Sequence, residues 1–341
     1  MKTKELDQFY TNPLTAKKLT SIFTENPKEL DHQKTKKFKS KIIEGDVIKV
    51  LKKLDKNNKF DVIIADPPYN IGKDFGNNID YRELQNYIKW SKNWIEQCLE
   101  LLSDNGLIYV YGFSEILARV ASQFPLEKQR FLIWYYTNKT SPSSNFWQRS
   151  HEAILCLWKN KRPNLEINQI REPYTNNYLK LNGKERANTK GRFGNKTTTY
   201  KVNGQGALPR DVITIPALAG GAGMVERHFM CKDCNRNLYH SSEKKNHENH
   251  SLITHPTQKP IQLTKKLIFS RINGKKSRIL IPFAGSGSEC IVAEMNNIEY
   301  LGIEINPEYV EYANKWIELI KNDKQRVMNG KIIYKIENNN V

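Results

Sequence analysis

Apolar residues along the chain form two kinds of pattern: short runs typical of strands, and helical spacings typical of amphipathic helices. The runs predict strands at 41–44, 60–65, 107–111, 131–136 and 153–158. The helical spacings predict helices at 47–54, 81–102 and 114–124. Asp46 and Asp80 are the predicted N-caps of the first two helices, and 103–106 should end the second. Strands alternating with helices indicate a doubly wound, mostly parallel α/β sheet of the Rossmann-like kind.

The periodicity fails between about residue 160 and residue 255 and then resumes. Gly, Asn, Lys and Thr dominate this region, so we expect an irregular subdomain with a recognition role. The later elements predicted are a helix at 260–272, a strand at 278–282, a helix at 288–295, a strand at 300–305 and a helix at 308–320. The predicted domain organisation is an N-terminal arm (1–40), one half of the α/β domain (41–159), the irregular region (160–255) and the other half (256–341).

A glycine-containing loop joins the predicted strand and helix in the segment IPFAGSGSECIVAEM, residues 281–295. Glycines let a ligand approach the backbone, and the helix N-terminus offers unpaired N–H groups. Glu304 follows Gly285 by 19 positions, a spacing that suits a carboxylate binding both hydroxyls of a ribose. Cys290 stands in the slot of the third glycine of a dinucleotide fingerprint, which favours a nucleoside cofactor without a pyrophosphate. A plain strand-to-helix turn is the alternative interpretation.

A stiff polar segment, ADPPYN at 65–70, follows the predicted strand 60–65. Its two prolines stiffen the backbone, which fixes the position of the Asp66 carboxylate relative to the Pro67 carbonyl. Two adjacent acceptors can bind both hydrogens of one exocyclic amine and direct its lone pair at an electrophile. Tyr69 can stack on the base that carries the amine. The alternative is a proline-rich turn with an Asp cap and a packed Tyr.

The positive net charge of the chain favours a nucleic-acid partner. The 341-residue chain has 54 Lys and Arg against 36 Asp and Glu, a net charge of +18, which favours a polyanionic partner, although a generally lysine-rich composition would look similar. The N-terminal residues contain no apolar signal core and no stretch is long and apolar enough for a membrane span, so we expect a cytoplasmic protein.

The five cysteines are mostly scattered, which makes a disulfide framework improbable. Cys231 and Cys234 form the one closely spaced pair, and His240, His247 and His250 follow them. These residues are enough ligands for a structural zinc ion, although the histidines match no defined finger pattern. Unliganded thiols in a polar loop are the other interpretation.

Four motifs together resemble the β-class amino DNA methyltransferases, which use S-adenosylmethionine. They are GD at 45–46, DPPY at 66–69, HPTQKP at 255–260 and FAGSG at 283–287. In that family the chain is circularly permuted, so the catalytic strand comes first, a target-recognition region follows, and the cofactor loop comes last. The order here is the same. The HPTQKP segment leads into a helix beside the cofactor in that family, and Thr257 and Pro260 also suit a simple helix start.

The resemblance implies a role for each matching residue. The catalytic loop would be Asp66, Pro67, Pro68 and Tyr69. The cofactor would be held by Asp46 near the adenine ring, by Glu304 at the ribose, and at the methionine end by Phe283, Gly285 and Gly287. The chain departs from the family in having Ile281 where an Asp is usual and Glu289 where a Thr is frequent.

The function implied is site-specific methylation of adenine N6 in double-stranded DNA, with the target base flipped into the pocket. Cytosine N4 is the nearest alternative, because the same two acceptors suit either amine. An RNA or protein methyltransferase and a DNA-binding protein without catalysis are more distant alternatives. The resemblance also implies a cognate restriction endonuclease and permits a homodimer.

Phosphate contact is expected from a basic stretch with interleaved aromatic residues inside and just before the irregular region. A solvated basic loop is the alternative. Its members are Arg149, Lys159, Lys161, Arg162, Arg171, Lys180, Lys184, Arg186, Lys190, Arg192, Lys196 and Lys201, with Tyr174, Tyr178, Phe193 and Tyr200. Trp134, Tyr135 and Tyr136 are candidates for the wall around a flipped base, although aromatic residues in strands more often lie in the core.

Overall fold

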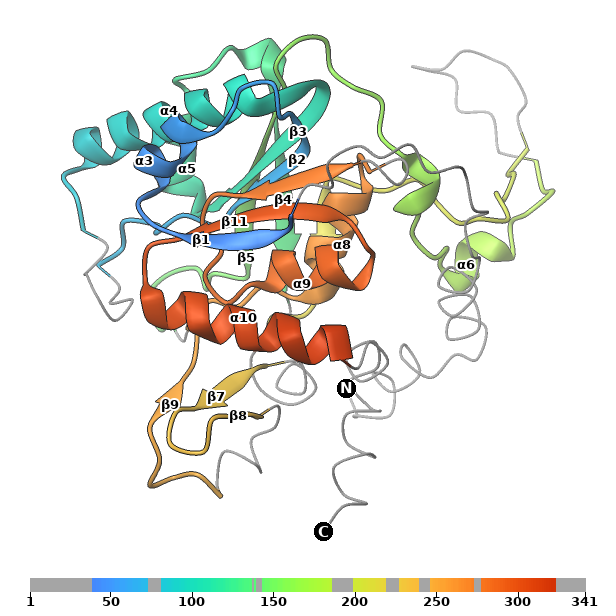
Figure 1. Cartoon of the computed structure of the whole chain (residues 1–341). Coiled ribbons are helices and arrows are strands. Elements are labelled where there is room, and N and C mark those ends of the chain that lie inside the picture. The colour runs from blue at the N-terminus through green and yellow to red at the C-terminus, as the bar shows by residue number, and fades with distance from the viewer. Residues whose placement is uncertain are drawn as a thin grey trace, which may run out of the picture. The chain divides into compact units, whose positions relative to one another are not determined.

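An eight-stranded sheet forms the centre of the computed structural model (Figure 1). The structure describes residues 39–72, 81–136, 138, 143–185, 199–218, 227–238, 246–272 and 277–322. The strand order is β1-β11-β10-β2-β3-β5-β4-β6. The strands of this sheet are β1 (Lys41–Glu44), β2 (Phe60–Ala65), β3 (Leu102–Gly112), β4 (Gln129–Tyr135), β5 (His151–Leu157), β6 (Val212–Thr214), β10 (Arg278–Ile281) and β11 (Glu299–Glu304).

Only β5 runs against its neighbours, since it pairs antiparallel with β3 and β4 while all other pairs are parallel. The mostly parallel α/β sheet expected from the sequence is therefore confirmed. The two late strands, β10 and β11, lie between β1 and β2, so the first and last parts of the α/β pattern build one continuous sheet.

Helices cover both faces of the sheet (Figure 1). One group contains α3 (Val47–Lys53), α4 (Leu84–Leu101) and α5 (Ser114–Ala121), and the other contains α8 (Ile261–Phe269), α9 (Ser288–Met295) and α10 (Pro307–Asn322). This arrangement is the doubly wound layering that alternating strands and helices predict. Among the described residues, no helix combines the length and the apolar character needed to cross a bilayer.

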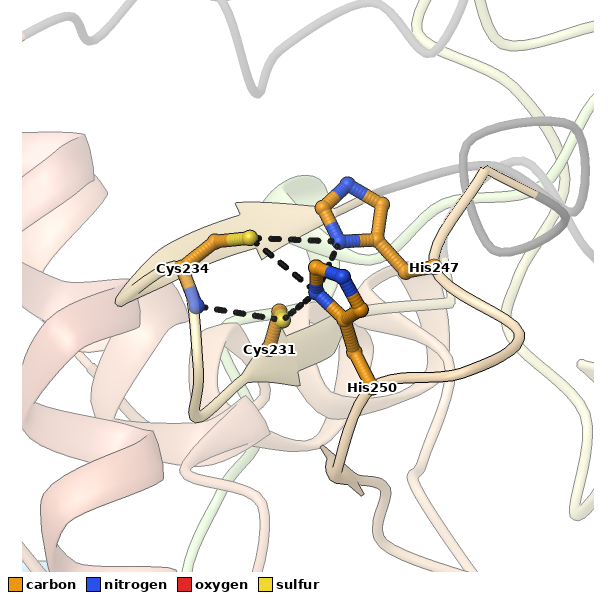
Figure 2. Close-up of side chains that lie close together, drawn as sticks. All are labelled: Cys231, Cys234, His247 and His250. Atoms are coloured by element: carbon orange, nitrogen blue, oxygen red, sulfur yellow. Dashed lines mark hydrogen bonds between the residues drawn. The ribbon is translucent and has the colours of Figure 1, made fainter.

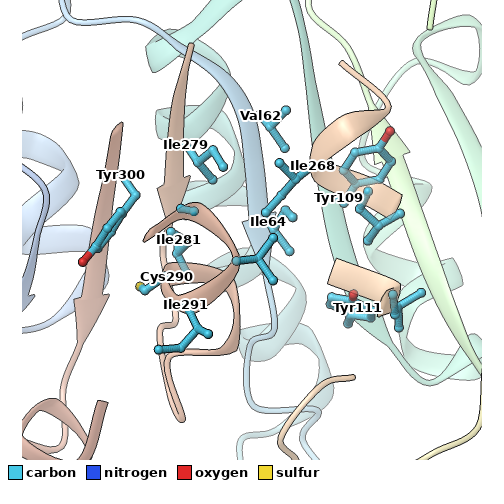
Figure 3. Packing of buried hydrophobic residues seen from close by; sticks show 14 of the residues in the cluster. Val62, Ile64, Tyr109, Tyr111, Ile268, Ile279, Ile281, Cys290, Ile291 and Tyr300 are labelled. Atoms are coloured by element: carbon cyan, nitrogen blue, oxygen red, sulfur yellow. The ribbon is translucent and has the colours of Figure 1, made fainter. Parts of the chain in front are cut away.

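Continuous apolar runs in β2 and β10 explain why these strands are central. Val62 and Ile64 of β2 and Ile279 and Ile281 of β10 are fully buried, and Ile268 of α8 packs over them (Figure 3). Burying one such side chain contributes roughly 1.5–3 kcal/mol. The helix group α8, α9 and α10 is held to the sheet by this cluster.

The predicted start of the second helix was wrong. Helix α4 begins at Leu84, and the carboxylate of Glu83 caps it by accepting from the backbone of Gln85 and Asn86, while Asp80 lies outside the described residues. The helix ends at Leu101, so its expected end before 103–106 is confirmed. These four residues form an irregular stretch of β3, since Leu102 pairs with Phe60 and Leu107 with Val62.

The predicted Asp46 cap of α3 is confirmed, since its carboxylate accepts from the Lys49 backbone at 3.0 Å. Helix α8 starts after Pro260 without a side-chain cap, so Thr257 does not cap it. Proline at this boundary ends the preceding extended segment and leaves no N–H unpaired.

The irregular region predicted at 160–255 contains more order than its composition suggests. It includes the short helices η2 (Ile167–Gln169) and α6 (Asn176–Leu179), and its strand β6 extends the large sheet beside β4. A second sheet of order β8-β7-β9 follows, built from β7 (Phe229–Cys231), β8 (Arg236–Leu238) and β9 (Leu252–Ile253).

Candidate active site

Four loops meet where the parallel strands end. Strands β1, β11, β10 and β2 are neighbours and point the same way, so the loops that follow them lie along one edge of the sheet. A cavity of about 390 Å³ opens there. Ligands of open α/β sheets bind at this edge. The predicted site residues that line the cavity are Asp46, Asp66, Pro67, Pro68, Tyr69, Phe283, Gly285 and Glu304.

The glycine loop is fastened by Glu304. The Gly285 N–H donates to Glu304 Oε2 at 2.8 Å, and the Asn306 N–H donates to Oε1 at 2.9 Å. Burial raises the pKa of the Glu304 carboxyl, and these backbone donors work against that rise. Each carboxylate oxygen has a further lone pair, so Glu304 can shape the loop and still accept from a ligand.

Two glycines of this loop are required for different reasons. Gly285 has a φ of +48°, which favours glycine, and a β-carbon there would lie only 2.8 Å from Nε2 of His255. Gly287 has φ +82, precedes α9, and would bring a β-carbon within 2.8 Å of the Ala313 β-carbon on α10. The described cavity wall does not include Gly287. It therefore serves the packing of α9 against α10, whereas the expected ligand contact at Gly287 stays a prediction.

Aromatic rings support the cavity beside the glycine loop. The Phe283 ring meets Trp90 and Trp94 of α4 edge to face, with ring centroids 5.7 and 5.1 Å apart. Trp94 is fully buried and supports the Phe283 ring from the protein interior. Phe283 and Trp90 line the cavity. Such contacts add about 0.5–1.5 kcal/mol each beyond area burial.

Asp66 lies in a buried ionic network. Its Oδ2 accepts from Lys259 Nζ at 2.7 Å, and its Oδ1 accepts from the Tyr69 hydroxyl at 2.7 Å. The side chains of Lys259 and Asp66 are 3% and 12% exposed. Burial raises the pKa of the Asp66 carboxyl, and the Lys259 charge opposes that rise. Lys259 therefore helps to keep Asp66 an ionised acceptor.

Tyr69 lines the cavity but is otherwise closely packed, so its stacking on a base stays a prediction. It is 8% exposed, its ring meets Phe113 edge to face at 5.2 Å, and its hydroxyl also lies 2.8 Å from Glu152 Oε2. Burial, together with Asp66 and Glu152, raises the Tyr69 pKa, so the hydroxyl remains a donor. One hydroxyl hydrogen is thus shared between two carboxyl groups.

The two prolines place their carbonyls differently. The Pro68 carbonyl accepts from the Tyr87 hydroxyl at 2.7 Å, which ties the loop to α4. Within the part of the chain that the structure describes, no donor is bonded to the Pro67 carbonyl. Both Pro67 and Asp66 line the cavity.

Three charged residues of the site were given no role from the sequence. Lys259 was quoted only as part of HPTQKP, Glu152 lies at the start of β5, and Glu289 was noted only as a departure from the family pattern. Lys259 and Glu289 line the cavity, and Glu152 lies 3.5 Å from Lys259 Nζ. For Glu289 the signal was a glutamate inside a predicted apolar helix, because buried charges need partners. Lys259 and Glu152 lie next to predicted elements, and no such signal marked them.

Glu289 is a buried acid in the wall of the cavity. It lies on the first turn of α9, fully in the interior, and the Thr264 hydroxyl donates to it at 3.4 Å. Burial, with the Asp66 charge, raises its pKa to about 7.

Two of the three aromatic residues considered for a base-binding wall are core residues. Trp134 and Tyr136 are buried in the main cluster, and Trp134 Nε1 donates to the Ile215 carbonyl at 2.8 Å. Tyr135 is partly exposed but does not line the cavity. The core interpretation is the one the structure supports.

The basic stretch is only partly placed. Arg149 pairs with Glu115 at 2.7 Å and lies over the Phe113 ring, while Tyr174 and Tyr178 stack with centroids 4.9 Å apart. The members that lie outside the described residues are Arg186, Lys190, Arg192, Phe193 and Lys196. Its role in DNA contact stays a prediction.

The fold and the site together define an α/β enzyme whose polar loop and glycine loop share one cavity. Residues 60–315 match the DNA methylase family whose members act at N6 or N4. The chain belongs to this family, which confirms the resemblance to amino DNA methyltransferases and the dependence on S-adenosylmethionine, while the β-class assignment stays a prediction. The protein is a DNA methyltransferase.

Curated relatives cover most of the chain. One is the type II methyltransferase M.HpaI of Haemophilus parainfluenzae, 29% identical over 82% of this chain and 74% of its own length. Another is the DNA adenine methyltransferase YhdJ of Escherichia coli strain K12, 27% identical over 82% of both chains. The solved structure of the PvuII DNA methyltransferase, described as cytosine-N4-specific, has the same fold, with a TM-score of 0.54 and 14% identity over 86% of this chain and 94% of its own.

Proposed function

We propose that this methyltransferase transfers a methyl group from S-adenosylmethionine to N6 of adenine in duplex DNA. The observation that carries the proposal is the position of Asp66 and Pro67, which line the same cavity as Gly285 and Glu304. An amine acceptor pair and a nucleoside-binding loop are thus brought within one enclosure, as a direct transfer requires.

The cofactor half of the cavity fits a nucleoside with a charged tail. Glu304 would accept from the ribose hydroxyls, Asp46 would lie near the adenine ring, and Phe283 and Gly285 would line the methionine end. The volume of about 390 Å³ lies within the range of roughly 300–1,000 Å³ typical of small-molecule sites. When bound, the cofactor supplies an electrophilic methyl group on a sulfonium.

Asp66 and the Pro67 carbonyl would orient the target amine. The exocyclic nitrogen of a base is a poor nucleophile because its lone pair is delocalised into the ring. If both of its hydrogens bond to fixed acceptors, the lone pair is directed out of the ring plane. Lys259 would act as a positioning residue, because it holds Asp66 ionised and in place at 2.7 Å.

Adenine is favoured over cytosine by the aspartate of the catalytic loop. In the family that the motifs resemble, Asp at the position of Asp66 is commoner in the adenine enzymes and Ser in the cytosine N4 enzymes. The relative named as a DNA adenine methyltransferase supports the same choice. Cytosine N4 remains the second candidate.

Base flipping and phosphate contact complete the proposal. The target amine is stacked inside the duplex, so the base must be extruded to reach Asp66. The basic stretch would hold the backbone during this step. Assignment to the β-class, the three-part division of the α/β domain, a cognate endonuclease, a homodimer and a cytoplasmic location stay predictions.

Labelled S-adenosylmethionine tests the proposal directly. The protein is incubated with the labelled cofactor and, separately, with duplex DNA, RNA or a mixed protein substrate. We expect label in DNA alone, and sequencing of the modified bases should place it on adenine N6 within a fixed site. Label on cytosine N4 would select the second candidate, and label in RNA or protein but not in DNA would refute the proposal.

A further inference from the structure

Four potential metal-ligating side chains converge beside the turn between β7 and β8, outside the cavity (Figure 2). We call them the Cys/His cluster, which consists of Cys231, Cys234, His247 and His250. One ligand atom from each residue lies within 4.8 Å of all the others.

The turn between β7 and β8 holds both sulfurs on one side. Cys231 ends β7 and is fully buried, and Cys234 follows after two residues. The Cys234 N–H points at the Cys231 sulfur at 3.4 Å, and Asn235 takes the left-handed φ of 53° that tightens the turn. Two cysteines separated by two residues are the usual half of a zinc site.

The histidine turn is tied to the cysteine turn by contacts other than those of the cluster. The Lys232 N–H donates to the Ser251 carbonyl at 2.9 Å, and the Ser251 N–H donates to the Asp233 carboxylate at 2.7 Å. Within the histidine turn, the His250 N–H donates to the His247 carbonyl at 3.0 Å. The ligands are therefore positioned in advance by the backbone.

Four distances within the cluster are close to those around a tetrahedral ion. The two Nδ1 atoms of His247 and His250 lie 3.3 Å apart, and three Sγ to Nδ1 distances run from 3.1 to 3.6 Å. Zinc bonds of about 2.3 Å to sulfur and about 2.0–2.1 Å to nitrogen give N–N and S–N edges of about 3.3 and about 3.6 Å.

Hydrogen bonds alone cannot satisfy this arrangement. His250 Nδ1 lies 3.3 Å from Cys231 Sγ, 3.1 Å from Cys234 Sγ and 3.3 Å from His247 Nδ1. An imidazole nitrogen carries either one hydrogen or one lone pair, so it can satisfy only one of these three neighbours. A cation at the centre would satisfy all four ligand atoms at once.

We propose that the Cys/His cluster binds one zinc ion. Two thiolates and two imidazoles in tetrahedral geometry favour Zn²⁺ over harder cations, which prefer oxygen ligands. Because the protein supplies four ligands, no coordination position is left open, and the ion is structural rather than catalytic.

The small sheet needs such a support. Its strands are only three, three and two residues long, and one face has a core of little more than Phe229, Cys231 and Leu238. Its other face packs Met230 and Ile253 on α10. Sheets of this size bury too little apolar surface to be stable without a cross-link such as a metal ion.

The ion would also hold the segment that enters the active site. Strand β9 is followed directly by the HPTQKP segment, which brings His255 and Lys259 to the cavity. On the other side, the His228 N–H donates to the Gln258 side chain at 3.1 Å just before β7. Zinc would therefore stabilise the segment that carries Lys259. The metal proposal itself does not depend on the reaction catalysed.

Metal analysis of the full chain tests the proposal. The protein is produced without a polyhistidine tag, purified without chelators and analysed by inductively coupled plasma mass spectrometry. We expect about one zinc per chain, and X-ray absorption at the zinc edge should show two sulfur and two nitrogen neighbours. A folded chain that neither contains zinc nor takes it up on dialysis would overturn the proposal, as would an oxygen-dominated shell.

Variants assign the ligands. Cys234→Ala and His247→Ala should each lose most of the bound zinc, whereas His240→Ala should retain it. His240 belongs to the same segment but lies outside the described residues, and the four described ligands already complete the site. Loss of zinc in His240→Ala, or full zinc in the Cys234→Ala/His247→Ala double variant, contradicts the assignment. If a variant does not fold, the absorption spectrum of the unmodified protein still decides the ligand set.

Discussion

Asp66 illustrates how one residue combines structural and chemical demands. Its carboxylate is nearly buried, and burial alone would favour the neutral acid. Lys259 and the Tyr69 hydroxyl each donate to it at 2.7 Å and keep the charged form in place. A carboxylate with such partners is an oriented acceptor, which suits the binding of an amine better than the removal of a proton from a weak acid.

Asp66→Asn tests this role with little change of shape. The amide keeps one acceptor oxygen but presents an NH₂ group where the target amine and Lys259 also donate. We expect the rate of methyl transfer to fall at least about 100-fold, the range found when one preorganised polar contact is removed. Calorimetry should show S-adenosylmethionine binding within a few-fold of the unmodified protein, and a variant with normal transfer would refute the role.

Glu289→Gln tests the raised pKa of the buried acid. The native state holds the Glu289 proton up to about pH 7, against an ordinary value of 4.5. The contribution of the Glu289 carboxyl to the free energy of unfolding is therefore full below about pH 4.5. It falls by on the order of 3 kcal/mol as the pH rises to 7. Glutamine stays neutral at every pH. The Tm of the variant minus the Tm of the unmodified protein should therefore be larger at pH 8 than at pH 5.

The control for this prediction is Glu318→Gln, which removes a carboxylate from an exposed position of α10. Denaturation scans at both pH values measure the difference. An equal Tm difference at pH 5 and pH 8 for Glu289→Gln would show that the acid is ionised throughout this range.

At the scale of elements, the site is an outcome of strand pairing. Strand β10 pairs with β2, and β11 pairs with β10, so the loops at Asp66, Gly285 and Glu304 become neighbours. Strand β5 adds Glu152, and the segment before α8 adds Lys259. Residues from five parts of the chain are thus brought together at the cavity or in the ionic network beside it.

Lys259→Met tests the coupling between these elements. Methionine keeps much of the length of the side chain but removes the charge that opposes the raised pKa of Asp66. We expect the acidic limb of the kcat profile to move to higher pH, because Asp66 must be ionised to accept from the amine. A lower kcat with an unchanged pH profile would indicate a purely structural role, and partial rescue by Lys259→Arg would support the charge.

At the scale of the whole molecule, the net charge of +18 predicts an electrostatic hold on DNA. Each phosphate contact adds about 0.9 to the slope of log K against log salt. The described part of the basic stretch includes Lys180 and Lys184, both exposed next to α6.

Lys180→Ala/Lys184→Ala should weaken DNA binding evenly across sequences and lower the salt slope by about 2. The matched control is Lys52→Ala/Lys53→Ala, which removes the same charge from the last turn of α3, outside the basic stretch. Fluorescence anisotropy at several salt concentrations measures both slopes. Equal slopes for the two pairs would show that the stretch makes no special phosphate contact.

Much of the element order could be predicted because periodicity reports burial directly. The fully apolar β2 and β10 and the amphipathic α4 left clear patterns, and the DPPY motif and the spacing from Gly285 pointed to Asp66 and Glu304. The start of α4 was misplaced because Asp80 and Glu83 are both acceptable N-caps by residue type, and the local pattern does not choose between them.

The sequence by itself determined the alternating α/β fold, the polar and glycine loops, and the set of cysteines and histidines, since each depends on residue type and spacing. Only the tertiary structure decided that Lys259 and Glu152 join Asp66 in one ionic network, that the Tyr69 hydroxyl lies between the two carboxyl groups, and that His247 and His250 meet the cysteine pair. The physical reason is that charge partners and metal ligands are selected by distance in space. That distance is set by the pairing of strands far apart in the chain.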